Sequence, residues 1–353
     1  MEEKNILILG GSRFIGYLTL LELAKKNWNI TIFNRQLSIP PKEFPNNINF
    51  VKGDRDKPKD YINAFNKKYD LVIDFSGFKL SQIEPIFSKY SSKIKQYIFI
   101  STVEVYQKPY PEILFEESLR NFSEKTLIED FLLKFKEKNQ ITILRPQGVF
   151  GPYDPCIAGL LFYRIQNNLP IIIKENSSKK IKLLYIYDLT KIINLLINNT
   201  KTFGKIYNVS GDEIITLNYL IACCAKICKK KPIIKNYTKD MSQFNLKHNP
   251  KKRHVDIAPA WPENNKISSN ELIKNDIKIE FTNIYNSLEK TYQWLNENKE
   301  RLNYFSFLGE NYILSNLNPP YYKTWFWKIS NLLDIRDKIK TKIKKFIIFK
   351  LKN

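Results

Sequence analysis

The strongest constraint on this chain lies near its start, where a short apolar run leads into a glycine-rich loop and then a helical pattern. The run is Asn5–Leu9 (NILIL), the loop is residues 10–16 (GGSRFIG), and the helical pattern covers residues 15–26. A strand, a glycine loop and a helix in this order leave backbone N–H groups at a helix N-terminus, where they bind phosphate. Gly10 would form the tight turn, and Gly16 would let the helix pack closely on the sheet. The pattern predicts a dinucleotide-binding unit.

The first 150 residues alternate short apolar runs with segments of helical length. Strands that alternate with helices are typical of βαβ units, and apolar runs without polar alternation fit strands covered on both faces. We therefore expect an α/β fold with a Rossmann-type doubly wound parallel sheet. The predicted strands are Asn5–Leu9, Ile30–Phe33, Leu71–Asp74, Tyr97–Ser101 and Ile141–Leu144, and the predicted helices are 15–26, 58–67 and 123–138.

After Gly151 the chain becomes richer in turns, with helical patterns near 188–198 and 216–229. We expect residues 1–150 to form the dinucleotide-binding core, and residues 151–300 to add the remaining sheet elements and a smaller substrate-binding lobe. Residues 301–353 form a basic, aromatic extension. In it, apolar residues recur at three- and four-residue spacing among lysines, which predicts a basic amphipathic helix. These apolar residues are Leu332, Ile335, Ile339, Ile343 and Phe346.

The net charge is +22, from 57 basic and 35 acidic residues. Such a balance suggests an anionic partner, which is a nucleic acid, a membrane surface or a phosphorylated substrate. Heavy use of Lys, Asn and Ile throughout the chain is a competing explanation, because compositional bias alone supplies much of the charge. The charge therefore does not choose between these partners.

Four cysteines are too few for a disulfide scaffold. Cys223, Cys224 and Cys228 lie close together, but the chain has two histidines and no second cysteine pair at ligand spacing. We therefore expect no metal and interpret the cysteines as small apolar residues of a core helix. A reducing, cytoplasmic compartment follows. The charged start MEEKNILILGG does not resemble a cleavable signal, and no apolar run is long enough for a spanning helix.

The glycine loop resembles the G-x-x-G-x-x-G loop of the extended short-chain dehydrogenase/reductase family, the group of the NAD-dependent epimerases and dehydratases. Arg13 replaces the middle glycine, where it would pair with a cofactor phosphate or obstruct binding. The variant GGxRFIG, together with Phe33-Asn34-Arg35, is similar to the branch that includes the chloroplast stem-loop-binding proteins. The resemblance implies NAD(P) as the cofactor.

The resemblance also implies a set of cofactor contacts. Asn34 stands where an acidic residue would bind the ribose diol of NAD, and Arg35 offers a partner to the 2′-phosphate of NADP, so NADP is slightly preferred. Asp54 matches the adenine-contacting aspartate of the family. The cofactor-binding residues implied are Gly10, Ser12, Arg13, Phe14, Ile15, Gly16, Asn34, Arg35, Asp54, Arg55, Ser76, Gly77, Lys125 and Pro146.

The family's reaction centre has a Ser or Thr after the fifth strand and a Tyr-x-x-x-Lys on the next helix. The tyrosine exchanges a proton with a substrate hydroxyl, and the lysine lowers the tyrosine pKa and holds the nicotinamide ribose. Residues 97–106 (YIFISTVEVY) resemble the first block and place Thr102 at the Ser/Thr position, with Glu104 as a further acid. In residues 121–129 (NFSEKTLIE), Lys125 matches the lysine, but Asn121 occupies the tyrosine position.

An amide cannot take over the proton exchange of a tyrosine. Three interpretations stay open: another acid such as Glu104 replaces the tyrosine, the protein binds nucleotide and sugar without redox turnover, or the alignment is shifted at the helix start. The catalytic candidates are Thr102, Glu104, Asn121 and Lys125.

Later blocks resemble the same family. Residues 144–152 (LRPQGVFGP) are similar to its RPxxVYGP segment, which implies that Gln147 and Gly148 contact the substrate. Residues 184–189 and 206–211 resemble two further blocks, so the likeness extends over about residues 4–297.

Two classes of function follow. The first is an NAD(P)-dependent oxidoreductase of the epimerase, reductase or dehydratase type, acting on a nucleotide sugar for glycan precursors. The second is a catalytically degenerate member that binds RNA or nucleotides. The basic extension suits an anionic membrane surface, which would place the protein at the inner membrane face. Family members often dimerise, so a homodimer is a further expectation.

Overall fold

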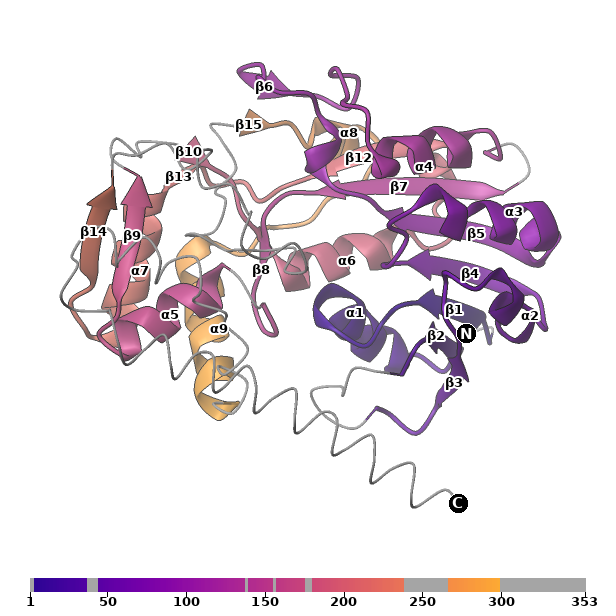
Figure 1. Cartoon of the computed structure of the whole chain (residues 1–353), viewed down its shortest axis with the longest axis horizontal. Helices are drawn as coiled ribbons and strands as arrows, with labels where there is room; N and C mark the ends of the chain where they lie inside the picture. The colour runs from indigo at the N-terminus through magenta and orange to yellow at the C-terminus, as the bar shows by residue number, and fades with distance from the viewer. Residues whose placement is uncertain are drawn as a thin grey trace, which may run out of the picture.

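A parallel sheet of seven strands forms the centre of the computed structural model, which describes residues 3–36, 44–136, 139–154, 157–174, 180–237 and 266–298 (Figure 1). The sheet order is β12-β7-β5-β4-β1-β2-β3. Strands β1 and β4 are neighbours although two strands separate them in the chain, so the winding direction changes between them. This arrangement confirms the doubly wound parallel sheet. The strands are β1 (Asn5–Leu9), β2 (Asn29–Asn34), β3 (Ile48–Lys52), β4 (Tyr69–Asp74), β5 (Ile94–Ile100), β7 (Gln140–Pro146) and β12 (Lys205–Val209).

The two faces of the sheet are covered by different helices, and β1 shows how the sequence achieves this. Ile6 and Ile8 pack in one apolar cluster with α1 (Phe14–Ala24) and α6 (Ile186–Leu196). Leu7 and Leu9 point to the other face and pack with α2 (Tyr61–Ala64), α3 (Glu84–Tyr90) and α4 (Glu124–Leu133). Because successive strand residues alternate between faces, a strand covered on both sides must be apolar throughout. Full burial of each such side chain contributes about 1.5–3 kcal/mol.

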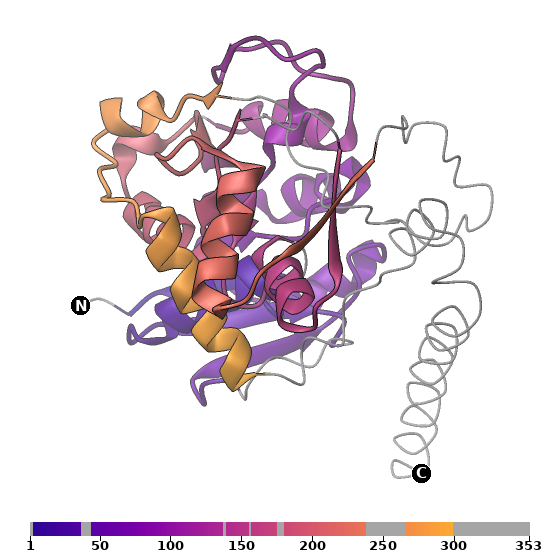
Figure 2. The same cartoon turned by 90° about the vertical axis from the view of Figure 1, so that its left-hand side faces the viewer.

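A smaller lobe lies beside the sheet, and a third apolar cluster forms its core (Figures 1 and 2). Its helices α5, α7 and α9 pack against one another, and β9 and β14 form a parallel pair. The chain reaches this lobe from the end of β7, returns to the sheet through α6 and β12, and then enters α7. The elements are α5 (Ala158–Gln166), β9 (Pro170–Lys174), α7 (Leu217–Cys228), β14 (Ile233–Tyr237) and α9 (Ile284–Glu297).

Short strand pairs connect the lobe to the sheet. They are β8 (Val149–Phe150) with β11 (Leu184–Tyr185), β10 (Lys180–Ile181) with β13 (Ile215–Thr216), and β6 (Ile113–Leu114) with β15 (Lys266–Ile267), which precedes α8 (Asn270–Lys274). The division at residue 150 stays a prediction. The basic extension at 301–353 lies outside the described residues.

Helix α7 carries the clustered cysteines. Cys223 and Cys224 are buried in the apolar core of the lobe, and burial raises the pKa of both thiols. They act there as small apolar side chains, as the sequence suggested. Within the described ranges, no helix has the length and apolar character that crossing a membrane requires.

Gly11 generates a prediction about the strand–loop–helix unit. Its φ is +78°, and a Cβ at this position would lie 2.7 Å from Cγ2 of Ile8 in the sheet. Gly204 has a similar φ of +72°, but its Cβ would meet only the flexible side chain of Lys136, at 3.6 Å. Both Gly→Ala variants lose about 1 kcal/mol through backbone strain. Gly11→Ala should lose about 1–3 kcal/mol more, because the methyl group overpacks the core.

Urea unfolding of the two variants measures this difference. Equal losses in unfolding free energy would contradict the crowding that the structure places at Gly11.

Candidate functional site

The carboxyl ends of β1 and β4 flank the glycine loop. Gly10 has a φ of +106° and Gly11 a φ of +78°, so both adopt a conformation that favours glycine. A Cβ on Gly16 would lie 2.9 Å from the Cα of Gly11, which shows how closely the first turn of α1 approaches the loop. Arg13 precedes α1 in an extended conformation, and no side chain caps the helix N-terminus. The first N–H groups of α1 are therefore available to an anionic ligand.

Two predicted residues hold the loop in place. The Asn34 side chain donates from Nδ2 to the main-chain oxygen of Gly10 at 3.4 Å and accepts from the N–H of Gln36 at 2.8 Å. The side chain of Ser76 lies against Gly10, where a Cβ would meet it at 3.3 Å. Arg35, directly after Asn34, is exposed. Asn34 thus connects β1 to β2 at the edge of the loop, and Arg35 is exposed beside it.

A buried ion pair underlies this region. The Arg55 guanidinium contacts both carboxylate oxygens of Asp74, donates to Ser76 Oγ at 3.0 Å, and lies 3.2 Å from the Tyr61 hydroxyl. Tyr97 donates to Asp74 Oδ2 at 2.6 Å. Burial opposes the charge of Asp74, but Arg55 outweighs it and holds the pKa of the Asp74 carboxyl below its usual value. That Arg55 binds the cofactor stays a prediction, because its guanidinium is already engaged inside the protein.

The segment after β5 carries two catalytic candidates. Thr102 begins a single 3-10 turn (Val103–Val105), and its Oγ1 accepts from the N–H of Glu104 at 3.2 Å. The Thr102 hydroxyl keeps its own proton available for another acceptor. Glu104 is exposed to solvent. The turn therefore holds the threonine in a fixed position and directs the glutamate away from the core.

Asn121 is tied to the same segment. Its Nδ2 donates to the main-chain oxygens of Glu104 at 2.6 Å and Tyr106 at 3.1 Å, and its backbone N–H donates to Val105 at 2.8 Å. The Oδ1 atom is buried and has no hydrogen-bond partner among the described residues. Two residues later Ser123 caps α4. The residue in the tyrosine position therefore acts as a connection between the start of α4 and the segment after β5.

Lys125 follows Asn121 by four residues and lies in the first turn of α4. Its Nζ donates to the main-chain oxygen of Ile100 at 3.0 Å, and it lies 4.5 Å from the centre of the Phe99 ring and 5.3 Å from that of Phe78. Burial lowers the pKa of Lys125 to about 8. Lys125 thus contacts the end of β5, and Asn121 contacts the segment that follows it; their catalytic assignment stays a prediction.

A second buried ion pair holds the segment after β5 in place, and neither of its residues was among the site residues predicted from the sequence. Arg145 on β7 binds Glu129 on α4 through Nε at 3.0 Å and Nη2 at 2.6 Å, and Ser101 donates to Glu129 at 2.6 Å. Arg145 also donates to the Tyr106 hydroxyl at 2.8 Å. The sequence feature that could have revealed the two ion pairs is a charged residue in an otherwise apolar strand, which is Arg145 in β7 and Asp74 in β4.

The predicted substrate contacts follow β7 directly. Gln147 is fully buried, and both polar atoms of its side chain lack a partner among the described residues. A buried amide without a partner requires water or a ligand. Gly148 has a φ of +48°, and its carbonyl accepts from the N–H of Leu184. Pro146 lies on β7 beside Val209 of β12. Among the described residues, the Gln147 amide directly after β7 is therefore buried with neither of its polar atoms hydrogen-bonded.

These residues fit a dinucleotide. Side chains on glycines 11 and 16 would collide with the loop and the sheet, the N-cap residue Arg13 makes no side-chain cap, and Lys125 donates to the main-chain oxygen at the end of β5. Ser12, Phe14 and Ile15 are only partly buried along the loop. Asp54 is also partly buried and accepts from the N–H of Asp56 at 3.1 Å. Gly77 is buried within the loop that follows β4.

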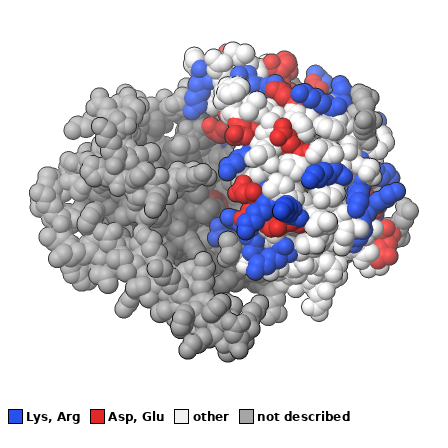
Figure 3. Space-filling model, turned by 45° about the vertical axis from the view of Figure 1, so that its right-hand side comes forward, with Lys and Arg blue, Asp and Glu red and all other residues white. Residues whose placement is uncertain are grey.

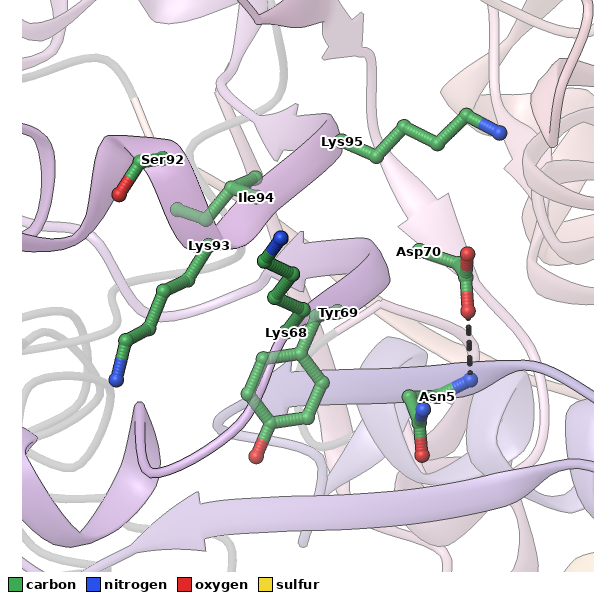
Figure 4. Close-up of a pocket in the computed structure, with 8 residues that line it drawn as sticks. All are labelled: Asn5, Lys68, Tyr69, Asp70, Ser92, Lys93, Ile94 and Lys95. Atoms are coloured by element: carbon green, nitrogen blue, oxygen red, sulfur yellow. Dashed lines mark hydrogen bonds between the residues drawn. The ribbon is translucent and has the colours of Figure 1, made fainter.

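A hollow of about 280 Å³ lies at the opposite edge of the sheet, where β1, β4 and β5 begin (Figure 4). Lys68, Lys93 and Lys95 line it, but Lys93 and Lys95 point in opposite directions. Lys93 also donates to the carbonyl of Phe65 at 2.6 Å, and Asp70 accepts from the N–H of Asn5 at 2.9 Å. Because its lysines do not converge, this hollow lacks the geometry of an anion site.

Comparison with known proteins points to one family. The model of the NAD dependent epimerase/dehydratase family matches residues 86–210. Over 245 residues the chain is 30% identical to chloroplast stem-loop binding protein of 41 kDa b from Arabidopsis thaliana, which covers 64% of this chain and 63% of that protein. The chain therefore spans less than two thirds of the length of this curated relative.

Solved structures share the fold. An epimerase from Methanothermobacter thermautotrophicus superimposes with a TM-score of 0.71 at 18% identity, over 85% of this chain and 94% of that chain. A UDP-glucose 4-epimerase from Thermus thermophilus, in complex with NAD, gives a TM-score of 0.67 at 15% identity, over 83% and 99%. The likeness covers the sheet and the lobe together.

Asp74→Asn should destabilise the protein by about 3–5 kcal/mol, because it leaves the Arg55 charge buried without a partner. The lowered pKa of the Asp74 carboxyl adds a pH signature. Its contribution is present above the unfolded pKa of about 3.9 and is lost as the pH falls through the folded value. Stability of the wild type should therefore decline more steeply than that of Asp74→Asn below about pH 4.

Chemical denaturation at several pH values measures both effects. The matched control is Asp130→Asn, since Asp130 forms an exposed ion pair with Arg120 at 2.7 Å. This control should change stability by no more than about 1 kcal/mol. Parallel acid curves for the wild type and Asp74→Asn would refute the assigned role of the pair.

Proposed function

Because this chain belongs to the NAD dependent epimerase/dehydratase family, we propose that it binds NAD(P) at the carboxyl edge of its sheet and acts as an oxidoreductase on a nucleotide sugar. The reaction would be of the epimerase, reductase or dehydratase type. The observation that carries the proposal is the glycine loop, whose closeness to the uncapped start of α1 suits a pyrophosphate.

Several residues of the chain would each have a separate role in binding and in the reaction. The uncapped start of α1 binds phosphate, and Gln147 offers its free amide to the sugar. Thr102 orients a substrate oxygen through its hydroxyl, which the 3-10 turn holds in place. The dinucleotide, when bound, supplies the hydride acceptor or donor. Asn121 exchanges no proton, because an amide does not titrate near neutral pH and its N–H groups are held by backbone oxygens.

The absence of an acid at position 34 supports NADP as the preferred cofactor. Asn34 carries no charge to repel a 2′-phosphate, and the exposed guanidinium of Arg35 follows it at the end of β2. The NAD complex of the similar UDP-glucose 4-epimerase supports use of NAD as well.

One observation favours a second function, RNA binding without turnover. Asn121 removes the family's proton-exchanging tyrosine, and the relative from Arabidopsis thaliana is named for binding a stem-loop. Figure 3 shows Lys and Arg spread over the described part of one face, with Asp and Glu among them. Mixed charges of this kind do not form a groove of one sign, which an RNA backbone would follow.

A panel of nucleotide sugars with NAD or NADP tests the enzymatic proposal. We expect a change in nicotinamide absorbance or incorporation of solvent deuterium for at least one sugar. Cofactor binding without either signal over a broad panel would exclude it. Preference for a stem-loop over an unstructured RNA of equal length, at physiological salt, would favour the second function instead, because unspecific binding follows from charge alone.

The preference for NADP leads to a specific variant. Arg35→Ala should weaken NADP binding about 10-fold or more, since a charge-assisted hydrogen bond contributes about 1.5–3 kcal/mol, while NAD binding stays within about twofold. Lys95→Ala removes one positive charge at the opposite edge of the sheet and serves as the control. Titration calorimetry with both cofactors measures the effect, and equal losses for NAD and NADP would contradict it.

A further inference from the structure

The proposed oxidoreductase needs a group that accepts or donates a proton, and Asn121 cannot supply one. On the basis of the proposed function, another residue of the site must therefore exchange this proton. The described groups compared for this role are two buried carboxylates, two buried tyrosines, two exposed glutamates and Lys125.

The buried carboxylates are fully engaged. Asp74 is held by Arg55 and accepts from Tyr97, and its pKa lies below the ordinary value although burial opposes this. Glu129 accepts from Arg145 on both oxygens and from Ser101 on one. Protonating either carboxylate would break an ion pair in the core. These groups therefore support the fold, and their ion pairs leave neither of them as the candidate for proton transfer.

The buried tyrosines are engaged as well. Tyr97 donates its proton to Asp74, and burial raises its pKa well above the ordinary value. Tyr106 donates to Oδ1 of Asn208 at 2.5 Å and accepts from Arg145, and burial raises its pKa to about 12. Neither phenol is able to replace the missing tyrosine, because each hydroxyl proton is already committed to an internal acceptor.

The exposed carboxylates also differ from a catalytic acid. Glu124 accepts from the N–H of Leu80 at 2.8 Å, which ties α4 to the loop after β4. The Glu104 side chain extends into solvent, and the backbone of this residue serves Thr102 and Asn121. The Glu104 carboxylate has no described hydrogen-bond partner that would fix its position, and a variant compares it with Lys125.

Lys125 has the environment that the other groups lack. Its Nζ has one hydrogen-bond partner among the described residues, the main-chain oxygen of Ile100, and two aromatic rings cover it. A neutral amine still keeps a lone pair and a second N–H when it donates to one carbonyl. It stands four residues after Asn121, in the first turn of α4.

We propose that Lys125 is the proton-transfer residue of this protein. In the oxidation step the neutral Nζ accepts the proton of the substrate hydroxyl and becomes an ammonium. The hydrogen on the carbon that bears this hydroxyl leaves as hydride to the oxidised nicotinamide of NAD(P). The electron pair of the broken O–H bond becomes the second bond between carbon and oxygen. In the reverse step the ammonium returns the proton to the oxygen, so atoms and electrons balance in both directions.

The charges around Lys125 support a transfer near neutral pH. Burial disfavours the ammonium most strongly and lowers the pKa to about 8, Asp74 and Glu129 favour it, and Arg55 opposes it. Glu124, on the first turn of the same helix, is bound to Leu80. A lysine in water titrates near 10.4, where very little neutral amine is present at pH 7. The oxidation rate should therefore rise with pH through about 8 and then level off.

A titration without substrate is the first test. Lysines of the full chain are dimethylated with carbon-13-labelled formaldehyde and followed by NMR over pH 6 to 11, and Lys125→Arg identifies the signal of residue 125. We expect this signal to titrate near 8 while the exposed lysines titrate about two units higher. A Lys125 signal that titrates with the others overturns the proposal.

Kinetics with the responsive nucleotide sugar are the second test. Lys125→Ala should lose at least about 100-fold in turnover, the lower range for a general acid–base, and its pH dependence near 8 should disappear. Added methylamine should restore part of the rate, which a purely structural lysine would not allow. Lys95→Ala, at the opposite edge of the sheet, is the control and should retain activity. Full activity of Lys125→Ala, or loss of activity in Glu104→Gln alone, overturns the proposal.

The two proposals fail in different ways. If the wild-type protein turns over no sugar, both the proposed function and the role of Lys125 are rejected. A wild-type protein that is active together with an active Lys125→Ala variant rejects only Lys125. Circular dichroism and NADP titration establish that each variant is folded and binds the cofactor.

Discussion

The candidate site depends on one buried interaction, the ion pair between Arg145 on β7 and Glu129 on α4. Both side chains are almost completely buried, at 1% and 0% exposure. Burying two charges costs more free energy than their attraction returns unless the remaining polar groups are satisfied. Here Ser101 donates to Glu129, and Arg145 donates to Tyr106 and to the main-chain oxygen of Glu116. The pair therefore fixes one arrangement of strand, helix and connecting segment.

The elements joined by this pair position the predicted chemistry. Glu129 lies one turn after Lys125 on α4, and Ser101 directly precedes Thr102, so the ion pair holds the lysine and the threonine relative to each other. On the other side of the glycine loop, the pair between Arg55 and Asp74 plays a similar part for Ser76. The two buried ion pairs at the carboxyl edge of the sheet thus fix the positions of polar side chains that are predicted to contact a ligand.

Much of the fold followed from the sequence, because buried strands leave long apolar runs and the glycine loop separates the first strand from the first helix. The helix Glu84–Tyr90 did not stand out, since it is short and mixes apolar with charged residues. The partners of Arg55 and Arg145 were beyond sequence reasoning, because ion pairs between residues 19 and 16 positions apart depend on how elements pack. The uses of Asn34 and Asn121 as connections between backbone segments were hidden for the same reason.

The exchange of tyrosine for Asn121 and the environment of Lys125 are linked by electrostatics. A phenolate at position 121 would stabilise the ammonium of Lys125 and keep it charged. An amide carries no charge, and its N–H groups are bound to the backbone oxygens of Glu104 and Tyr106. Burial and Arg55 disfavour the ammonium of Lys125, and Asp74 and Glu129 favour it. Because Asn121 carries no charge, it does nothing to offset the burial that lowers the pKa of Lys125.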